Sequence, residues 1–532
     1  MLEPNEFSKL TKITILKIQI MLVKTYGSAV YGINAFKITI EVNIGKGKKM
    51  YIVGLPDNAV KESQMRIHTA FKNNRLHMPR NGIIVNMAPA DIKKEGSAYD
   101  LSIAVGILAA SEQVFSDQLD DYLIMGELSL DGSLLPIKGA LPIAIQALKD
   151  GFKGMIVPKA NAREAAMVKD IEVYGMNNIT EVCDFLNKAI SLEPEFVDPR
   201  EEFAINTSNF SMDFSDVKGQ ANIKRSMEVA AAGGHNLILI GPPGAGKTML
   251  AKRLPTILPP LNLFEALETT KIHSVAGRLG SNAALVAQRP FRSPHHTISD
   301  VALVGGGNNP QPGEISLAHN GVLFLDELPE FKRTVLEVMR QPLEDRCVTI
   351  SRARFTVDYP ATFMLVASMN PCPCGFFNHP EKDCVCAPGM VQKYLSRISG
   401  PLLDRIDIQI EVTPVNFDEL AGKGDSERSD AVRERVIQAR IIQEHRFEEV
   451  DGVYNNSQMS SNHIRAFCTI DKAGTTLLKT AMNKLNLSAR AYDRILKVSR
   501  TIADLSGSQN IEIEHLAEAI QYRSLDRENW GV

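Results

Sequence analysis

Residues 241–248, with the sequence GPPGAGKT, have the residue types and the spacing of a loop that binds a triphosphate. They follow the apolar run at 237–240, which is typical of a strand, and they open a stretch that is typical of a helix. A glycine-rich turn between a strand and a helix points backbone N–H groups and the positive helix end toward phosphates. We expect the nucleotide to contact the whole loop, namely Gly241, Pro242, Pro243, Gly244, Ala245, Gly246, Lys247 and Thr248.

Two side chains of this loop have separate tasks. Lys247 is expected to reach the β- and γ-phosphates, and the hydroxyl of Thr248 is expected to ligate Mg²⁺. The loop therefore predicts ATP and Mg²⁺ as cofactors.

A second apolar run, at 322–325, ends in the two carboxylates Asp326 and Glu327. In a P-loop ATPase the first carboxylate holds Mg²⁺, directly or through water, and the second can act on the attacking water. We therefore assign Asp326 to the metal and Glu327 as the general base. A buried strand that merely ends in two solvated acids would look the same in isolation, and the upstream phosphate loop favours the catalytic interpretation.

These residues need a scaffold of alternating strands and helices. Residues 214 to about 410 show that alternation, which predicts a parallel sheet flanked by helices. The stretch between Lys247 and Asp326 is longer than a compact nucleotide domain needs, so we expect a loop or hairpin insertion at 278–313. Downstream, helical patterns cover 431–446, 475–485, 489–505 and 513–522.

The upstream part of the chain has a different pattern. Strand patterns at 37–42, 50–53 and 82–86 are mixed with helical patterns at 59–71 and 101–110. A stretch rich in proline and acidic residues at 191–213 is expected to be a linker. The expected organisation is an extension at 1–20, an α+β domain at 21–190, the linker, an α/β nucleotide-binding core at 214–411 and a helical lid at 412–532.

Composition narrows the class of protein. The 532 residues are 44% hydrophobic and 23% charged, which is typical of a globular protein of two to four domains. The longest apolar run, 101–110, is too short to span a bilayer, and the first twenty residues lack the apolar core of a signal peptide. Regular patterning begins only at Met21, which could be an alternative start.

The cysteine count indicates the cellular compartment, and the net charge limits the kinds of partner. Seven cysteines, an odd number with four clustered, argue against a secreted disulfide scaffold, so we expect a cytoplasmic protein with no membrane partner. The net charge of −3 excludes a uniformly basic surface but allows a locally basic channel.

Several further stretches carry a family resemblance that extends from residue 21 to the C-terminus. They are YGSAVYG at 26–32, VGLPD at 53–57, RSPHH at 292–296, NPCPCG at 370–375 and GPLLDRID at 400–407. Together with the phosphate loop, they make the chain resemble the magnesium-chelatase-like AAA+ ATPases of the YifB/ComM family. The resemblance implies a homohexameric ring with ATP at the subunit interfaces and a P-loop AAA+ αβα core.

The resemblance also implies roles for polar residues outside the loop. Asn370 follows the strand pattern at 363–369 and matches the sensor-1 residue, which orients water near the γ-phosphate. Arg405 takes the place of the arginine finger that reaches a neighbour's ATP, and Arg397 is close enough to compete for that role. Arg490 matches the sensor-2 position on the lid. Without the motif context, each arginine would read as half of a surface ion pair.

The first domain, by the same resemblance, is similar to the Lon-protease-like domain with a ribosomal-S5-like fold. Active Lon-type proteases use a Ser–Lys dyad, and alignment of the motifs puts Ala98 at the nucleophile and Leu141 at the lysine. Without a hydroxyl or an amine there is no activated nucleophile, so we expect a non-proteolytic domain. Ser97 and Lys138 lie nearby, but proximity in sequence does not supply attack geometry.

Four cysteines, Cys372, Cys374, Cys384 and Cys386, form two C-x-C pairs after Asn370. Their thiolates could close a tetrahedral, structural Zn²⁺ site, with His379 as a spare ligand. An iron–sulfur cluster needs the same number of ligands, and four reduced cysteines in a loop are the plain alternative.

Residues 347–357 are expected to form a hairpin with its tip at 351–354. Relatives place this hairpin in the central channel, where Arg352 and Arg354 would hold phosphates without reading bases. A solvated surface turn is the alternative.

The resemblance then implies a DNA motor that uses ATP, acting on single-stranded or branched DNA, as ComM relatives are held to do in branch migration. A metal-chelatase-like or chaperone-like remodeller of a protein partner is one alternative. An ATP-dependent protease is another, which Ala98 and Leu141 disfavour.

Overall fold

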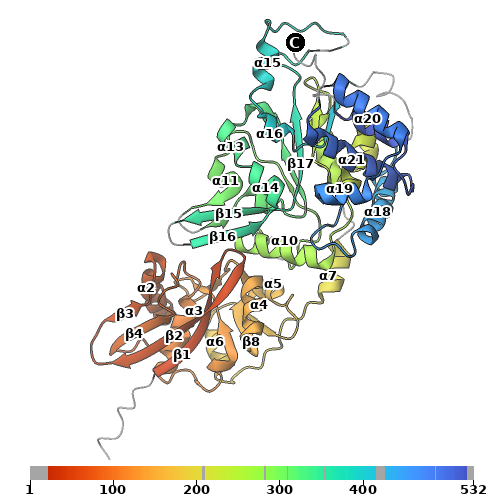
Figure 1. Ribbon diagram of the computed structural model, residues 1–532. Coiled ribbons are helices and arrows are strands. Elements are labelled where there is room, and N and C mark those ends of the chain that lie inside the picture. The colour runs from red at the N-terminus through yellow and green to blue at the C-terminus, as the bar shows by residue number, and fades with distance from the viewer. Residues whose placement is uncertain are drawn as a thin grey trace, which may run out of the picture. The chain divides into compact units, whose positions relative to one another are not determined.

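The computed structural model describes residues 22–206, 210–280, 283–307, 310–352, 355–377, 379, 381–414, 426–485 and 487–523. It divides the chain into two compact units, one formed by Met1–Ala204 with Thr270–Val286 and the other by Ile205–Thr269 with Ala287–Val532 (Figure 1). No pattern in the sequence indicates that Thr270–Val286 groups with the first unit.

The first unit is built on a mixed seven-stranded sheet in the order β3-β4-β2-β1-β5-β8-β9. The strands β1, β2 and β4 pair antiparallel, whereas β3 with β4 and β1 with β5, β8 and β9 in succession are parallel. Their bounds are β1 (Leu22–Tyr31), β2 (Asn34–Gly45), β3 (Met50–Val53), β4 (Gly82–Ala88), β5 (Tyr122–Ile124), β8 (Gly154–Pro158) and β9 (Glu172–Met176). A small hairpin joins β6 (Glu127–Leu128) and β7 (Leu134–Leu135).

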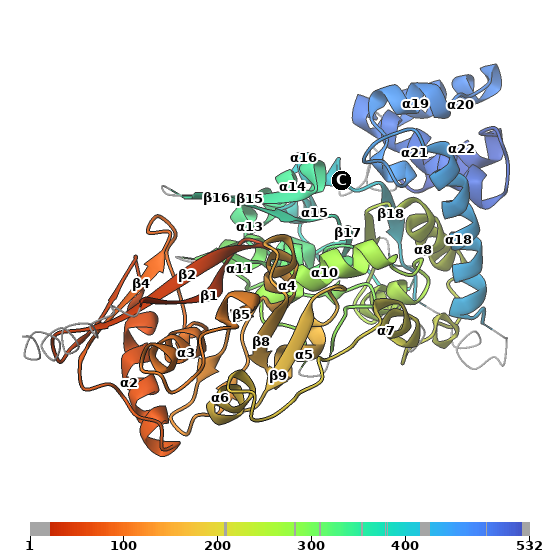
Figure 2. The ribbon, with the colours of Figure 1, turned by 90° about the horizontal axis from the view of Figure 1, so that it is seen from below.

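Helices complete this unit: α2 (Asn58–Asn73), α3 (Asp100–Ala110), α4 (Ala140–Lys149), α5 (Lys159–Ala165) and α6 (Ile179–Leu186), with one turn of 3₁₀-helix at Leu119–Asp121. Every residue of α3 is buried, and the helix packs on β1 and β2 (Figure 2). The strands and helices predicted for this part of the chain are present, which confirms the α+β class. Helix α7 (Pro199–Asn206) lies within the stretch expected to be a linker.

The second unit contains a five-stranded parallel sheet in the order β11-β14-β17-β10-β18. The bounds are β11 (Phe291–Arg292), β14 (Val322–Leu325), β17 (Met364–Met369), β10 (Leu237–Ile240) and β18 (Ile408–Glu411). Every residue of β10, β14 and β17 is buried, because parallel central strands are covered on both faces. The expected parallel α/β core is confirmed.

The elements around this sheet are short helices and two hairpins. The helices are α8 (Ala221–Gly233), α9 (Lys247–Arg253), α10 (Leu263–Val275), α11 (Asp300–Val304), α12 (Glu314–Leu317), α13 (Arg333–Glu337), α14 (Arg340–Asp345), α15 (Met390–Leu395) and α16 (Gly400–Leu403). One-turn 3₁₀-helices occur at Phe214–Asp216, Leu254–Thr256 and Leu328–Glu330. The hairpins pair β12 (Gly305–Gly306) with β13 (Gln311–Pro312) and β15 (Cys347–Arg352) with β16 (Phe355–Pro360).

The C-terminal helices form the expected lid, and α18 and α21 pack on α8 of the core (Figure 2). They are α18 (Ser429–Arg446), α19 (Ser461–Phe467), α20 (Lys472–Lys484), α21 (Ala489–Leu505) and α22 (Ile513–Gln521), with a 3₁₀ turn at Asn456–Gln458. Side chains of Ser460, Asp471 and Ser488 accept hydrogen bonds from backbone N–H groups at the starts of α19, α20 and α21.

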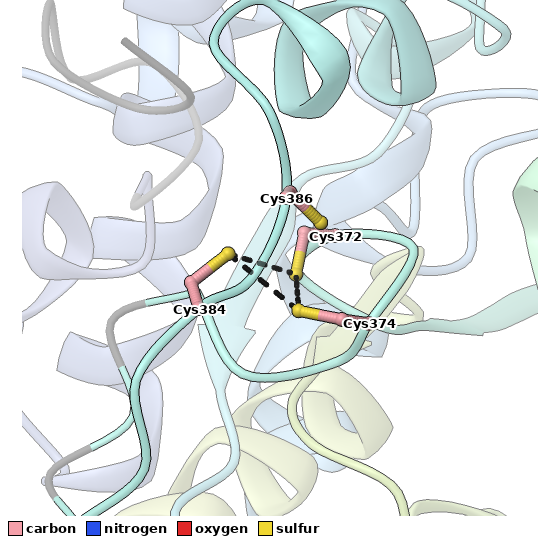
Figure 3. A group of neighbouring side chains, drawn as sticks. All are labelled: Cys372, Cys374, Cys384 and Cys386. Atoms are coloured by element: carbon pink, nitrogen blue, oxygen red, sulfur yellow. Dashed lines mark hydrogen bonds between the residues drawn. The ribbon is translucent and has the colours of Figure 1, made fainter.

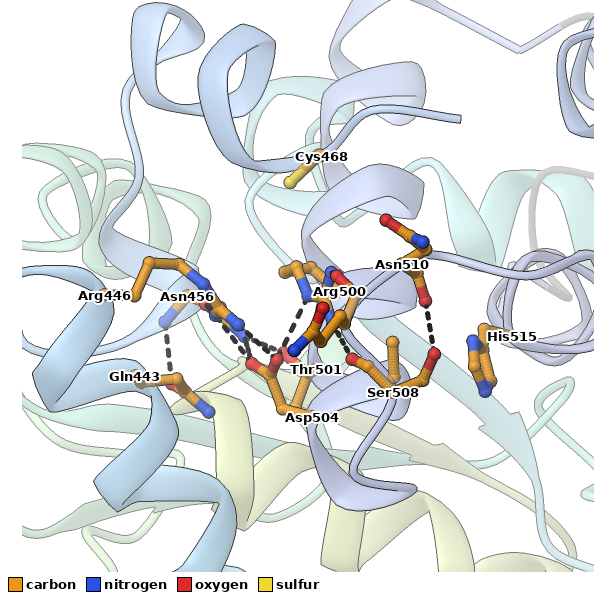
Figure 4. A network of polar contacts seen from close by, with 12 residues as sticks. Gln443, Arg446, Asn456, Cys468, Arg500, Thr501, Asp504, Ser508, Asn510 and His515 are labelled. Carbon is orange, nitrogen blue, oxygen red and sulfur yellow. Dashed lines mark hydrogen bonds and ion pairs between the residues drawn. The ribbon is translucent and has the colours of Figure 1, made fainter. Parts of the chain in front are cut away.

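A buried polar network fastens the lid helices to one another (Figure 4). The carboxylate of Asp504 accepts hydrogen bonds from Arg446, from Asn456 at 2.8 Å and from Arg500 at 3.0 Å. Gln443 in turn accepts from the backbone N–H of Asn456 at 3.0 Å. The network links α18, α21 and the turn between α18 and α19.

None of the helices in the described ranges combines the length and the apolarity needed to cross a membrane. The apolar helix α3 has 11 residues, whereas a spanning helix needs about 20.

Candidate functional site

The phosphate loop lies between β10 and α9. Gly244 (φ +81°) and Gly246 (φ +83°) adopt the left-handed backbone conformation that glycine tolerates without strain. Gly241 approaches the residue after the neighbouring strand β18 so closely that an added Cβ would lie 2.4 Å from the carbonyl oxygen of Val412. The glycines therefore set the path of the loop, and Gly246 caps α9 at its N-terminus.

The ammonium group of Lys247 is folded back into this loop. It donates hydrogen bonds to the carbonyl oxygens of Gly241 at 2.7 Å and Pro242 at 2.9 Å, and to Oδ1 of Asn370 at 3.1 Å. Burial lowers the pKa of Lys247, and the nearby charges of Asp326 and Glu327 oppose that shift. The sequence-predicted Asn370, 123 residues away along the chain, is thus in direct contact with the loop lysine.

Thr248 and Asp326 face each other across the ends of α9 and β14. The hydroxyl of Thr248 donates to Oδ2 of Asp326 at 2.7 Å, and Ser368 donates to Oδ1 of the same carboxylate. Both side chains offer oxygen atoms as ligands, and Mg²⁺ prefers oxygen ligands. The pair therefore fits the metal that the phosphate loop predicts.

Glu327 has an uncommon backbone conformation and an exposed carboxylate. Its φ of +55° is in the left-handed region, which is uncommon for a residue with a Cβ and often marks a functional position. Its N–H is close to Oδ1 of Asp326 at 3.1 Å and Oγ of Ser368 at 3.3 Å. The side chain is 57% exposed, and Nδ1 of His296 lies 3.7 Å from Oε2.

Two members of this site were missed from the sequence. Ser368 is the polar residue of the otherwise apolar strand β17, and that contrast was its signal. His296 belongs to the His-His pair of the RSPHH stretch, whose two rings lie 4.1 Å apart between centroids. The stretch belongs to the predicted insertion at 278–313 and to the family resemblance, neither of which assigns a role to His296.

The three candidate arginines lie on other parts of the second unit. Arg405 is buried and donates to Glu344 and to the carbonyl oxygen of Pro401. Arg490 is 63% exposed and pairs with Asp404 at 3.1 Å. Arg397 forms an exposed ion pair with Glu330 at 2.9 Å.

Arg405 and Arg490 line one hollow at the junction of α16 with the lid. The hollow is strongly polar, and its charged lining consists of Glu344, Asp404, Arg405, Arg490, Asp493, Arg494 and Lys497. Arg494 is held by the buried Asp407 at 3.0 Å. Burial alone would raise the pKa of Asp407, but Arg494, His235 and Lys497 hold that pKa well below its ordinary value.

The expected hairpin is present as β15 and β16, which pair in antiparallel register from Cys347 with Pro360 to Arg352 with Phe355. Thr349 on β15 donates to Asp358 on β16 at 2.7 Å. Arg354 and the side chain of Arg352 lie outside the described residues.

The four cysteines meet in space (Figure 3). The Sγ atoms of Cys372, Cys374, Cys384 and Cys386 all lie within 4.8 Å of one another. His379, the expected spare ligand, accepts hydrogen bonds at Nδ1 from the N–H groups of Glu381 and Lys382. Among the described residues, the group of converging ligand atoms contains the four sulfurs and does not include His379.

In the first unit, the positions aligned with the protease dyad have no catalytic groups. Ala98 accepts a backbone hydrogen bond from Gly126 at 2.9 Å, and the N–H of the buried Leu141 donates to Glu164 at 2.9 Å. Lys138 is exposed, and its aliphatic stem covers Gly277.

Three family profiles match about four fifths of the chain. The profile described as "Magnesium chelatase, subunit ChlI" matches residues 213–420. The profile "Subunit ChlI of Mg-chelatase" matches 40–161, and "Magnesium chelatase, subunit ChlI C-terminal" matches 426–523.

Individual proteins are similar over the same length. The competence protein ComM of Haemophilus influenzae is 45% identical over 94% of this chain and 97% of its own length. The protein YifB of Escherichia coli (strain K12) is 44% identical over 94% of this chain and 96% of its own. An archaeal Lon protease of Thermococcus kodakarensis is 28% identical over 26% of this chain and 22% of its own length.

Proposed function

The chain belongs to the YifB/ComM family of magnesium-chelatase-like AAA+ proteins, and we propose that it is an ATP-hydrolysing motor that moves along DNA in the cytoplasm. The observation that carries the ATPase part is one cluster at the carboxyl ends of neighbouring parallel strands. There Lys247 contacts Asn370, and Thr248 contacts Asp326. Carboxyl ends of parallel strands are where ligands bind in such sheets.

The chain's own groups divide the work of hydrolysis. Lys247 exchanges its two loop carbonyls for phosphate oxygens, which are stronger partners for a buried ammonium because they carry charge. Thr248 and Asp326 would hold Mg²⁺, which supplies charge neutralisation on the phosphate oxygens. The exposed carboxylate of Glu327 takes the proton of the attacking water, and the Asn370 amide orients that water.

We further propose that the motor is a homohexamer in which the hollow around Arg405 and Arg490 meets a neighbour's nucleotide. Support comes from the cations that converge there, with the guanidinium of Arg490 largely exposed and, among the described residues, paired with Asp404 alone. Such a pair is weak in water, so a phosphate can replace Asp404 as the partner of Arg490. Arg405 lies deeper, and we assign it to the same hollow.

DNA, single-stranded or branched, is the proposed track, in branch migration or recombination. Two features support it: the β15–β16 hairpin, which carries Arg352 and Arg354 at its end, and the similarity to a protein named for competence. A hexamer would present this hairpin six times, which offsets the acidic net charge locally.

The test is ATP turnover with and without DNA, at low salt, followed by an assay of unwinding and branch migration. We expect single-stranded or branched DNA to raise turnover several-fold, and rising salt to remove the effect. Lys247→Ala is the inactive control. Unchanged turnover with every DNA, in protein that hydrolyses ATP, would favour a remodeller of a protein partner.

The four-cysteine cluster extends the proposal to a structural metal. Four thiolates whose sulfurs all lie within 4.8 Å of one another suit one tetrahedral Zn²⁺. We expect about one zinc per chain by elemental analysis of protein never exposed to a chelator.

A further inference from the structure

The four cysteine sulfurs have the spacing of a single tetrahedral ion. Cys372 lies 3.3 Å from Cys374 and 3.7 Å from Cys384, and Cys374 lies 3.5 Å from Cys384. Four sulfurs at about 2.3 Å from one zinc lie about 3.8 Å apart. The three distances among Cys372, Cys374 and Cys384 are close to that value, and the sulfur of Cys386 lies within 4.8 Å of each of them. An iron–sulfur cluster, with several irons between its ligands, would hold the thiolates farther apart.

The second half of the segment that carries the cysteines, residues 381–390, buries little side-chain surface, whereas Cys372 and Gly375 in the first half are buried. From Glu381 to Met390, all described side chains are exposed except those of Cys384 and Cys386, which are half-buried. Val385 between them is 83% exposed. A segment that buries so little apolar surface does not offset the entropy of ordering, and small metal sites supply that free energy through their ligands.

This segment touches the phosphate loop directly. Gly375 follows Cys374 with a φ of +85°, and a Cβ added there would lie 2.5 Å from Cδ of Pro243. The backbone of the cysteine segment therefore rests on the ring of Pro243, in the middle of the loop that binds the nucleotide. Pro242 of the loop, together with Pro371 and Gly375 of the segment, lines a shallow pocket at this contact.

The segment is also attached to Asn370 at both of its ends. Cys372 is two residues beyond Asn370, which contacts Lys247 at 3.1 Å. Where the segment leaves the cluster it enters α15, and the hydroxyl of the buried Tyr394 of that helix lies close to the backbone of Asn370. One ion bound to the cysteines would thus constrain both segments that contact Asn370, the residues that follow it and helix α15.

From these contacts we infer that metal on the four cysteines braces the phosphate loop and Asn370, so that metal occupancy sets how firmly the site holds ATP. The inference rests on the proposed ATPase function and adds a positioning role for residues that touch neither nucleotide nor Mg²⁺. A displacement of about 1 Å at a reacting group can lower a reaction rate about 10²-fold. Loss of the metal would therefore act by shifting the phosphate loop and Asn370. The parallel sheet itself remains folded without the metal.

Two variants of the full chain separate the metal from the brace. In the double variant Cys384→Ser/Cys386→Ser we expect zinc to be lost and the dissociation constant of a fluorescent ATP analogue to rise about tenfold or more. In Gly375→Ala we expect zinc to be retained, because all four thiols remain, while the analogue still binds about tenfold more weakly as the new methyl group displaces Pro243.

Each variant has a matched control. Gly389→Ala introduces a side chain at a similar backbone angle, φ +76°, in the same segment, but meets nothing within 4 Å. Cys183→Ala removes a cysteine of the first unit. Both are expected to keep zinc and wild-type affinity for the analogue, and circular dichroism checks that every variant is folded.

The readouts are zinc content, the charge-transfer absorption of Co²⁺ substituted at the thiolates, and analogue affinity without turnover. Wild-type protein that takes up neither zinc nor Co²⁺ overturns the metal site. The bracing role is overturned if the zinc-free double variant binds the ATP analogue with wild-type affinity. It is likewise overturned if the zinc-loaded Gly375→Ala variant does so. Zinc-loaded wild type that never binds the analogue overturns the proposed ATPase and the brace together, and leaves the metal site standing.

Discussion

At the scale of single residues, the site combines a fixed backbone with a free functional group. Glu327 is held by the strand before it and by the hydroxyl of Ser368, in a backbone conformation uncommon for glutamate. Its carboxylate nevertheless points to solvent, 3.7 Å from His296. The uncommon backbone conformation thus sets the direction of the side chain, and, among the described residues, the imidazole is its neighbour in ion-pair geometry.

Glu327→Gln is expected to bind ATP normally and to hydrolyse it about 10²-fold or more slowly, since the amide keeps the shape of the side chain but cannot take a proton. Turnover and analogue binding are measured side by side. Glu330→Gln removes a carboxylate from the adjacent surface ion pair with Arg397 and should have little effect. Wild-type turnover in Glu327→Gln would show that Glu327 is not the general base.

His296→Ala is expected to reduce turnover about tenfold with ATP binding preserved, because Glu327 loses the neighbour that limits its orientations. His445→Ala is the control, since it removes an exposed histidine on α18 of the same unit. Equal turnover in the two variants would show that proximity to Glu327 has no catalytic consequence.

At the scale of elements, one parallel sheet collects residues that are far apart in the chain. The strands β10, β14 and β17 are adjacent in the sheet, and each is followed by a residue of the site: Gly241, Asp326 and Asn370. The lid helices are joined by buried charge instead of by strand pairing. Asp504 is fully buried among two arginines and an amide, so its partners depend on it.

Asp504→Ala is expected to lower the free energy of unfolding of the second unit by about 3–5 kcal/mol, because Arg446 and Arg500 would stay buried without their counter-charge. Denaturant titration followed by circular dichroism measures the change. Glu427→Ala, which removes an exposed partner of Arg435, should cost about 1 kcal/mol or less. Equal losses in the two variants would contradict a lid organised around Asp504.

At the scale of the whole molecule, the nucleotide cluster and the arginine hollow are two separate constellations of the second unit. If the hollow serves a neighbour's nucleotide, a working site needs two subunits. That requirement distinguishes a ring motor from a monomeric ATPase.

Lys247→Ala and Arg490→Ala are each expected to be nearly inactive alone, yet a mixture of the two should recover turnover. In a randomly mixed ring about a quarter of the interfaces join an intact loop to an intact Arg490. ATP turnover of the premixed proteins measures this recovery. A mixture of Lys247→Ala with Thr248→Ala has no intact loop and must stay silent, and equal silence of the first mixture would place Arg490 outside the neighbour's site.

Local sequence patterns determined most of the secondary structure and the location of the phosphate loop. The phosphate loop, the apolar strands, the lid helices and the hairpin at 347–360 were predictable because periodicity, glycine and proline placement act over a few residues. The pairing of two C-x-C motifs was predictable for a related reason, since nine intervening residues are enough to bring the thiols together.

What the tertiary structure alone decided depends on contacts between distant segments. No local sequence pattern indicates that Gly375 packs on Pro243 or that His296 lies beside Glu327. The same is true of the grouping of Thr270–Val286 with the first unit. The placement of Arg490 beside Asp404, 86 residues away, is of the same kind. Sequence spacing fixes which groups exist and which element carries them, whereas the packing of those elements decides which groups touch.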